Sequence, residues 1–297
     1  MTRETFVAFP CDGNWLYGIV HLPDHPAPRG VLVVVGGPQY RVGSHRQFLL
    51  LARALADAAI PVMRFDYRGM GDSEGDAITF EDIETDIRGA IDTFFAQVPS
   101  LREVVLWGLC DAASAALMYA HRDRRVSGVV LLNPWVRTEQ GIARAYLKHY
   151  YVTRLFDPEL WRKIRAGEFS VTAAAKSLLQ AVGTGLGLTK SFGPAADPAA
   201  GSRAPDTGQS AASKAPLPER MLTGLNLYDG RLMIVLSGDD LTAREFKDLA
   251  TTERPWRKSL RAARVTIHEL PAANHTFARR AWRDQVATWT AEWVKSW

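Results

Sequence analysis

The sequence is poor in metal-binding and disulfide-forming residues. Among 297 residues it has only two cysteines, Cys11 and Cys110, too far apart for a disulfide framework or a cysteine-based metal site. Its seven histidines do not cluster, and neither H-E-x-x-H nor the phosphate-binding GxxxxGK[ST] motif occurs. We therefore expect no metal and no cofactor, so that any importance of a cysteine lies in its chemistry.

Long apolar runs and a dominant charge sign are absent as well. Runs such as 31–35 and 129–132 are far shorter than the roughly 18 residues that span a bilayer, and the N-terminus lacks the apolar segment of a secretory signal. We expect a cytoplasmic protein without an integral membrane segment. The net charge of +4 arises from acids and bases that alternate along most of the chain, which argues against a nucleic-acid partner. With 47% hydrophobic and 23% charged residues, the composition is that of a globular protein.

Apolar strand patterns alternate with amphipathic helical patterns along most of the chain. After a hairpin over 6–10 and 16–22, strands are predicted at 31–35, 61–66, 104–107, 126–132, 232–236 and 265–270, and helices at 44–59, 80–95 and 111–119. Ser44 is the expected N-cap of the first helix. The alternation predicts an α/β fold with a mostly parallel central sheet and helices on both faces. Near the C-terminus, apolar side chains share one helical stripe that we interpret as core packing: Trp282, Val286, Trp289, Trp293 and Trp297.

The strand-helix rhythm stops between Pro134 and Leu227. We expect a helical cap over 136–227, inserted between two parts of the core at 1–135 and 228–297. Within it, the composition of about 183–218 turns to Gly, Ala, Pro and Ser, which predicts a mobile linker.

One strand-to-helix turn carries the features of a nucleophile elbow. Residues 104–114 run from an apolar strand into a helix through Gly108-Leu-Cys110-Asp-Ala112, with Cys in the place where Ser is commoner. Small residues two positions before and after the nucleophile fit such a sharp turn. The following helix N-terminus favours a thiolate and an oxyanion. The alternative is a buried structural cysteine, but the setting favours a nucleophile.

A second motif fits the G-x-S-x-G pattern of serine hydrolases more literally. Residues 71–75 read Gly-Asp-Ser-Glu-Gly, but no strand precedes Ser73 and no helix begins there. We interpret this segment as a structural loop after the strand that ends at Asp66.

A nucleophilic thiol needs a base, and the base needs an orienting acid. His275 follows the last predicted strand, and Asp239 and Asp240 follow the strand before it. The order Cys110, Asp240, His275 predicts a triad. We favour Asp240, with Asp239 as the alternative acid, because one of the two can cap the helix that starts near Thr242.

An oxyanion hole needs two backbone donors. The first is expected to be the N–H of Asp111, which follows the nucleophile. The second should come from the loop after the strand at 31–35. Pro38 has no N–H, which leaves Gln39 or Gly37, and we choose Gln39.

With the elbow, the loop at 64–75 and Asn274-His275, the sequence resembles an α/β-hydrolase. Residues 36–46, 107–114 and 237–243 resemble more narrowly the exosortase A system-associated hydrolases, a bacterial family that accompanies exopolysaccharide and protein-sorting loci. The resemblance implies an α/β-hydrolase sheet and a triad of the cysteine type.

The expected activity is cleavage of an ester or thioester through an acyl-cysteine intermediate. Two alternatives stay open: acyl transfer to a sugar or amine acceptor, and a non-catalytic binding protein on the same fold. The substrate is expected to be a small-molecule or carrier-bound acyl compound. Basic residues outnumber acidic ones over 137–168, which fits either a solvated face or an anionic carrier.

Overall fold

A computed structural model describes residues 2–37, 39–137 and 215–297. The chain divides into two compact units, Met1–Val136 with Leu217–Trp297, and Arg137–Pro216. The first unit is described below. Most of the expected cap and linker, at 136–227 and about 183–218, lies outside the described residues. Residues 217–227, the C-terminal end of the predicted cap, form a helix of the first unit.

The strands of the described part form one sheet in the order β1-β2-β4-β3-β5-β6-β7-β8. They are β1 Arg3–Cys11, β2 Asn14–Leu22, β3 Arg29–Val34, β4 Val62–Asp66, β5 Glu103–Leu109, β6 Val126–Leu132, β7 Arg231–Asp239 and β8 Val265–Asn274. The β1–β2 and β2–β4 pairs are antiparallel, and the other five pairs are parallel. The predicted mostly parallel sheet is thereby confirmed.

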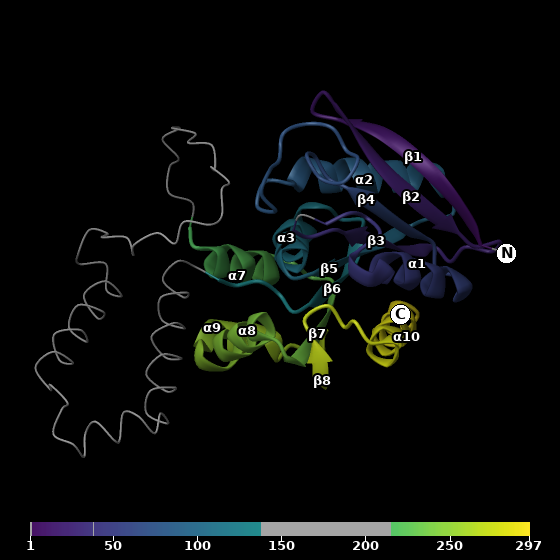
Figure 1. Ribbon diagram of the computed structural model, residues 1–297. Helices are drawn as coiled ribbons and strands as arrows, with labels where there is room; N and C mark the ends of the chain where they lie inside the picture. Colours follow the sequence, from purple (N-terminus) through teal and green to yellow (C-terminus); the bar gives the residue numbers. More distant parts are fainter. Residues whose placement is uncertain (1, 38, 138–214) are drawn as a thin grey trace, which may run out of the picture. The chain divides into compact units, whose positions relative to one another are not determined.

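Helices cover both faces of this sheet (Figure 1). They are α1 Gln47–Asp57, α2 Glu84–Gln97, α3 Asp111–Tyr119, α7 Leu217–Leu227, α8 Leu241–Thr252, α9 Arg254–Leu260 and α10 Arg280–Val294, with short 3-10 turns at Ser44–Arg46 and Ala120–Arg122. The helices α1 and α10 lie side by side on one face, and α2, α3 and α8 pack on the other. Among the described residues, no helix combines the length and apolar character needed to cross a bilayer.

The two faces divide the apolar side chains of each buried strand. In β3, Val31 and Val33 contact the α1–α10 face, whereas Leu32 and Val34 contact the α2–α3 face. This alternation explains why the central strands read as continuous apolar runs. The apolar stripe of the C-terminal helix packs as expected, because Trp293 is buried among the side chains of the α1–α10 face.

The first helix begins differently from the expectation. Ser44 opens a single 3-10 turn and does not cap α1, which starts at Gln47. His45 and Arg46 have φ values of 53° and 60°, so the backbone changes direction before the helix can form.

The parallel register brings the loops that follow β3 and β5 together. Strands β3 and β5 are neighbours although α1, β4 and α2 separate them in sequence, and Val34 lies opposite Gly108. The strand order reverses at this pair, which is where ligand sites form in open α/β sheets. The loop after β3 therefore lies beside the turn that follows β5.

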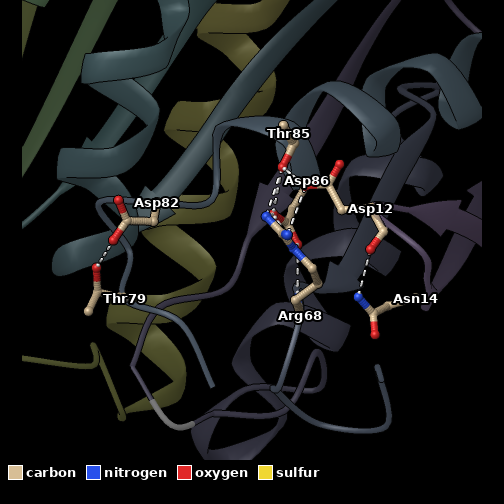
Figure 2. A network of polar contacts seen from close by, with 7 residues as sticks. All are labelled: Asp12, Asn14, Arg68, Thr79, Asp82, Thr85 and Asp86. Carbon is tan, nitrogen blue, oxygen red and sulfur yellow. Dashed lines mark hydrogen bonds and ion pairs between the residues drawn. The ribbon is translucent and has the colours of Figure 1, made fainter. Parts of the chain in front are cut away.

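A polar network fixes the N-terminal hairpin to the start of α2 (Figure 2). The Arg68 guanidinium binds the buried Asp86 carboxylate through Nε and a terminal nitrogen, and it forms an ion pair with Asp12 at 2.8 Å. Thr85 Oγ1 lies 3.0 Å from Asp12 Oδ2. Since these residues come from three separate segments, the network holds the loop after β4 in place.

Within that loop, Ser73 has structural contacts. Its hydroxyl donates to the Asp66 carbonyl at 2.6 Å and accepts the Tyr17 N–H at 3.0 Å. The side chain is buried. The hydroxyl is therefore occupied by two backbone groups, which agrees with a loop-fixing role for this motif.

Candidate active site

Cys110 lies on the sharp turn between β5 and α3. Its backbone has φ 63° and ψ −122°, a conformation that L-residues rarely adopt. The strain is held by backbone hydrogen bonds: the Cys110 N–H donates to Leu132, and its carbonyl accepts the N–H groups of Trp135 and Ala113. The Cys110 side chain is half-buried, so it can be reached from solvent.

The glycine two residues before Cys110 is required by close packing. A Cβ at Gly108 would lie 2.6 Å from the backbone carbonyl of Ala112, in the first turn of α3. A larger residue at this position would push the helix away from the strand. The turn thus has the geometry that the spacing of small residues predicts.

His275 and Asp240 meet at the carboxyl ends of β8 and β7. The His275 Nδ1 atom lies 3.0 Å from Asp240 Oδ2, and the Cys110 side chain is near enough to the imidazole to raise its pKa. Asp240 Oδ2 accepts the Ala243 N–H at 2.9 Å and so caps α8. The structure therefore brings together Cys110, His275 and Asp240 in one chain of polar contacts.

The neighbouring carboxylate is placed differently. Asp239 ends β7 opposite Asn274, and its side chain is exposed. The Asp240 side chain is only 8% exposed. Of the two candidate acids, Asp240 is the one in contact with His275.

The charges of His275 and Asp240 stabilise each other. The hydrogen bond with Asp240, followed by that with Cys110, raises the pKa of His275 to about 10 against the opposing effect of burial. Burial raises the pKa of Asp240, but the hydrogen bonds from His275 and Ala243 outweigh it and leave the pKa below its usual value. At neutral pH the pair is thus an imidazolium beside a carboxylate.

The expected second oxyanion donor is corrected by the structure. The Gln39 N–H does not point to the elbow, because it donates to the Gly37 carbonyl at 2.7 Å in a tight turn where Gly37 has φ 59°. The Gly37 N–H faces the elbow and donates to Asp111 Oδ2 at 2.8 Å. Backbone N–H groups of Asp111 and Gly37 are therefore the candidate pair of donors.

One residue near the site was not foreseen. The buried Asn133, directly after β6, donates through Nδ2 to the His275 carbonyl and to Ser237 Oγ, each at 2.9 Å. Its Oδ1 accepts the Ser237 N–H. Asn133 has φ 43°, in the left-handed region that Asn adopts more readily than most residues. An Asn at the end of an apolar strand was therefore the sequence signal that could have pointed to this residue.

No group of three or more His, Cys, Asp or Glu side chains among the described residues is arranged to hold a metal ion. The polar groups of the site are those of the elbow, of the loop after β3 and of the turns after β6, β7 and β8.

A cysteine on a strand-to-helix elbow, followed in sequence by an acid and a histidine after later strands, defines an α/β-hydrolase fold. Residues 31–289 match the family model described as "Alpha/beta hydrolase family", which covers most of the chain. The protein therefore belongs to this family. No curated protein matches the chain.

Solved structures share the fold at low sequence identity. An esterase from Pyrococcus furiosus is 14% identical with a TM-score of 0.63, covering 100% of this chain and 93% of its own. Est1E from Butyrivibrio proteoclasticus, with ferulic acid bound, is 14% identical with a TM-score of 0.60, covering 97% of each chain. A dienelactone hydrolase from Anabaena variabilis is 14% identical with a TM-score of 0.59, covering 98% of this chain and 96% of its own. At this identity the similarity concerns the fold.

Proposed function

We propose that this α/β-hydrolase cleaves esters or thioesters through an acyl intermediate on Cys110. The observation that carries the proposal is the contact chain from Cys110 through His275 to Asp240. Further support comes from the similar folds, which include an esterase and a dienelactone hydrolase. The motifs that resemble the exosortase A system-associated hydrolases fit the same cysteine chemistry.

In the proposed first step, Cys110 reacts as the thiolate of a thiolate–imidazolium pair, in which His275 already holds the proton. The sulfur attacks the substrate carbonyl carbon, and the resulting oxyanion is held by backbone N–H groups of the elbow and the loop after β3. When the intermediate collapses, the bond to the leaving alcohol or thiol breaks. The leaving group takes the proton from His275, and the acyl group remains on Cys110 as a thioester.

In the second step, His275 accepts a proton from water, and the oxygen attacks the acyl carbon. The bond to sulfur breaks, the carboxylic acid leaves, and the thiolate–imidazolium pair of Cys110 and His275 is restored. Asp240 keeps the imidazole oriented and stabilises its positive charge throughout. With a sugar hydroxyl or an amine in place of water, the same site transfers the acyl group, which is the alternative outcome of this chemistry.

A substrate series with two cysteine variants tests the proposal. Wild type, Cys110→Ala and Cys11→Ala are assayed on p-nitrophenyl esters and acyl-CoA thioesters of increasing chain length, with and without amine or sugar acceptors. Cys11 is the matched control, because it is buried in β1 and burial raises the pKa of its thiol. We expect turnover in wild type and Cys11→Ala and none in Cys110→Ala. Equal activity in Cys110→Ala, or no activity on any substrate, contradicts the proposal.

A further inference from the structure

The side chain of Asp111 lies between the candidate oxyanion donors. Asp111 Oδ2 accepts the Gly37 N–H and Oδ1 accepts the Ala112 N–H, both at 2.8 Å. Both carboxylate oxygens are thus bound to backbone N–H groups, and one of these, the Gly37 N–H, is a candidate oxyanion donor. A substrate oxyanion needs the same Gly37 N–H.

The loop after β3 is shaped around this carboxylate. A Cβ at Gly36 would overlap Asp111 Oδ1, so residue 36 must be glycine if the side chain is to lie there. At Gly37, the positive φ turns the N–H toward Asp111 Oδ2. Because two consecutive residues accommodate the carboxylate, its position is a feature of the fold and not an accident of one rotamer.

We propose that the Asp111 carboxylate is a gating group of the oxyanion pocket, which an acyl substrate must displace from the Gly37 N–H before Cys110 can be acylated. This inference rests on the proposed function and deepens it, because it assigns a specificity-determining role to a side chain. A carboxylate and an oxyanion cannot share the donor, since both are negative. Substrates with large binding surfaces can supply the free energy of displacement, whereas small activated esters supply little of it and should acylate Cys110 slowly.

Opposing effects act on the Asp111 carboxylate at its position beside the Gly37 N–H. Burial raises the pKa of Asp111, while hydrogen bonds from the N–H groups of Gly37, Ala112 and Asp111 itself and the charge of His275 act in the opposite direction. Burial, with the charges of Asp111 and Asp86, raises the pKa of Tyr67 to about 12. The cost of burial therefore opposes the hydrogen bonds that keep the side chain in the pocket.

Two substitutions test the gate with a small substrate. In Asp111→Asn the shape is kept, but the amide lacks the charge and cannot accept both N–H groups equally well. In Asp111→Ala the acceptor is removed. Asp248→Asn, on the exposed face of α8, is the control for the loss of one negative charge. Acylation of Cys110 by p-nitrophenyl acetate is followed by rapid quench and intact mass.

We expect both Asp111 variants to acylate about tenfold faster than wild type, because a charge-assisted hydrogen bond is roughly twice as strong as a neutral one. The control should acylate at the wild-type rate. We also expect added acetate to inhibit Asp111→Ala by taking the place of the missing carboxylate, and to leave wild type unaffected.

The failures of the two proposals give different patterns. Acyl-enzyme that forms on wild type as fast as on both Asp111 variants, or faster, overturns the gate and leaves the proposed function standing. Acetate that does not inhibit Asp111→Ala also counts against the gate. No acyl-enzyme on wild type or on any variant, with p-nitrophenyl acetate and with longer thioesters, overturns the proposed function and the gate with it.

Discussion

His275 Nδ1 lies 3.0 Å from Asp240 Oδ2, and the same carboxylate oxygen accepts the N–H of Ala243. Asp240 thus orients the candidate base and caps α8 with one atom. Because the cap fixes the carboxylate in the first turn of a helix, the imidazole has a rigid partner. This arrangement allows the orienting role to be separated from the structural one.

Asp240→Asn should separate these roles, because Asn is also a good N-cap but carries no charge to stabilise an imidazolium. We expect kcat/KM for an ester to fall on the order of 10²- to 10⁴-fold, with little loss of stability. Asp239→Asn is the matched control and should change the rate little, since its side chain is exposed. If Asp239→Asn has the larger effect, the acid is assigned to the wrong residue.

The raised pKa of His275 predicts the sign of a pH effect on stability. The folded value is about 10 and the unfolded value about 6.5, so the folded protein holds the proton more tightly. The stabilisation is complete below pH about 6.5 and is lost as pH rises towards about 10. Because the ring is 35% exposed, solvent screening reduces its size.

The measurement is the free energy of urea unfolding at several pH values for wild type and His275→Gln. The advantage of wild type should shrink from neutral to alkaline pH. Repeating the series in the Cys110→Ala background should give a shallower change, since the thiol contributes to the shift. An advantage that stays constant or grows with pH contradicts the assigned contacts.

The positive φ of Cys110 predicts that the position of the nucleophile costs the protein stability. Residues at such positive φ carry strain on the order of 1–3 kcal/mol, which glycine avoids. We expect Cys110→Gly to be about 1 kcal/mol more stable than Cys110→Ala, with both inactive. Thermal or urea unfolding of the two variants checks this, and equal stability would mean that the turn is not strained.

Ser73→Ala should lower the stability of the protein and leave its activity unchanged. Loss of the hydroxyl leaves the Asp66 carbonyl and the Tyr17 N–H without their partner, which costs about 1–3 kcal/mol of folding free energy. The kcat of the folded protein should not change. Activity that is lost in folded Ser73→Ala would show that the literal G-x-S-x-G motif has a catalytic part.

The sequence predicted what depends on local pattern. Apolar runs ending in glycine or polar residues gave the strands and the elbow, and the order of Cys110, Asp240 and His275 follows from where strands end. The sequence did not show which side chain would enter the pocket. Asp111 was treated only as a backbone donor, because its contact with Gly37 depends on the pairing of β3 with β5.

The same limit explains the other differences. Whether Gly37 or Gln39 presents its N–H depends on the φ of Gly37, which sequence leaves open because glycine adopts either sign. Residues 217–227 fall within the predicted cap because the strand-helix rhythm stops between Pro134 and Leu227; in the structure they form α7, and Met221 and Leu225 are buried in the core.

The most direct test of the central claim is the mass of the protein during turnover of a p-nitrophenyl ester, quenched within one catalytic cycle. We predict an increase of one acyl group, sensitive to hydroxylamine, located on the peptide that contains Cys110, present in Cys11→Ala and absent in Cys110→Ala. Turnover with the acyl group on another residue, or with the adduct still formed in Cys110→Ala, contradicts the account.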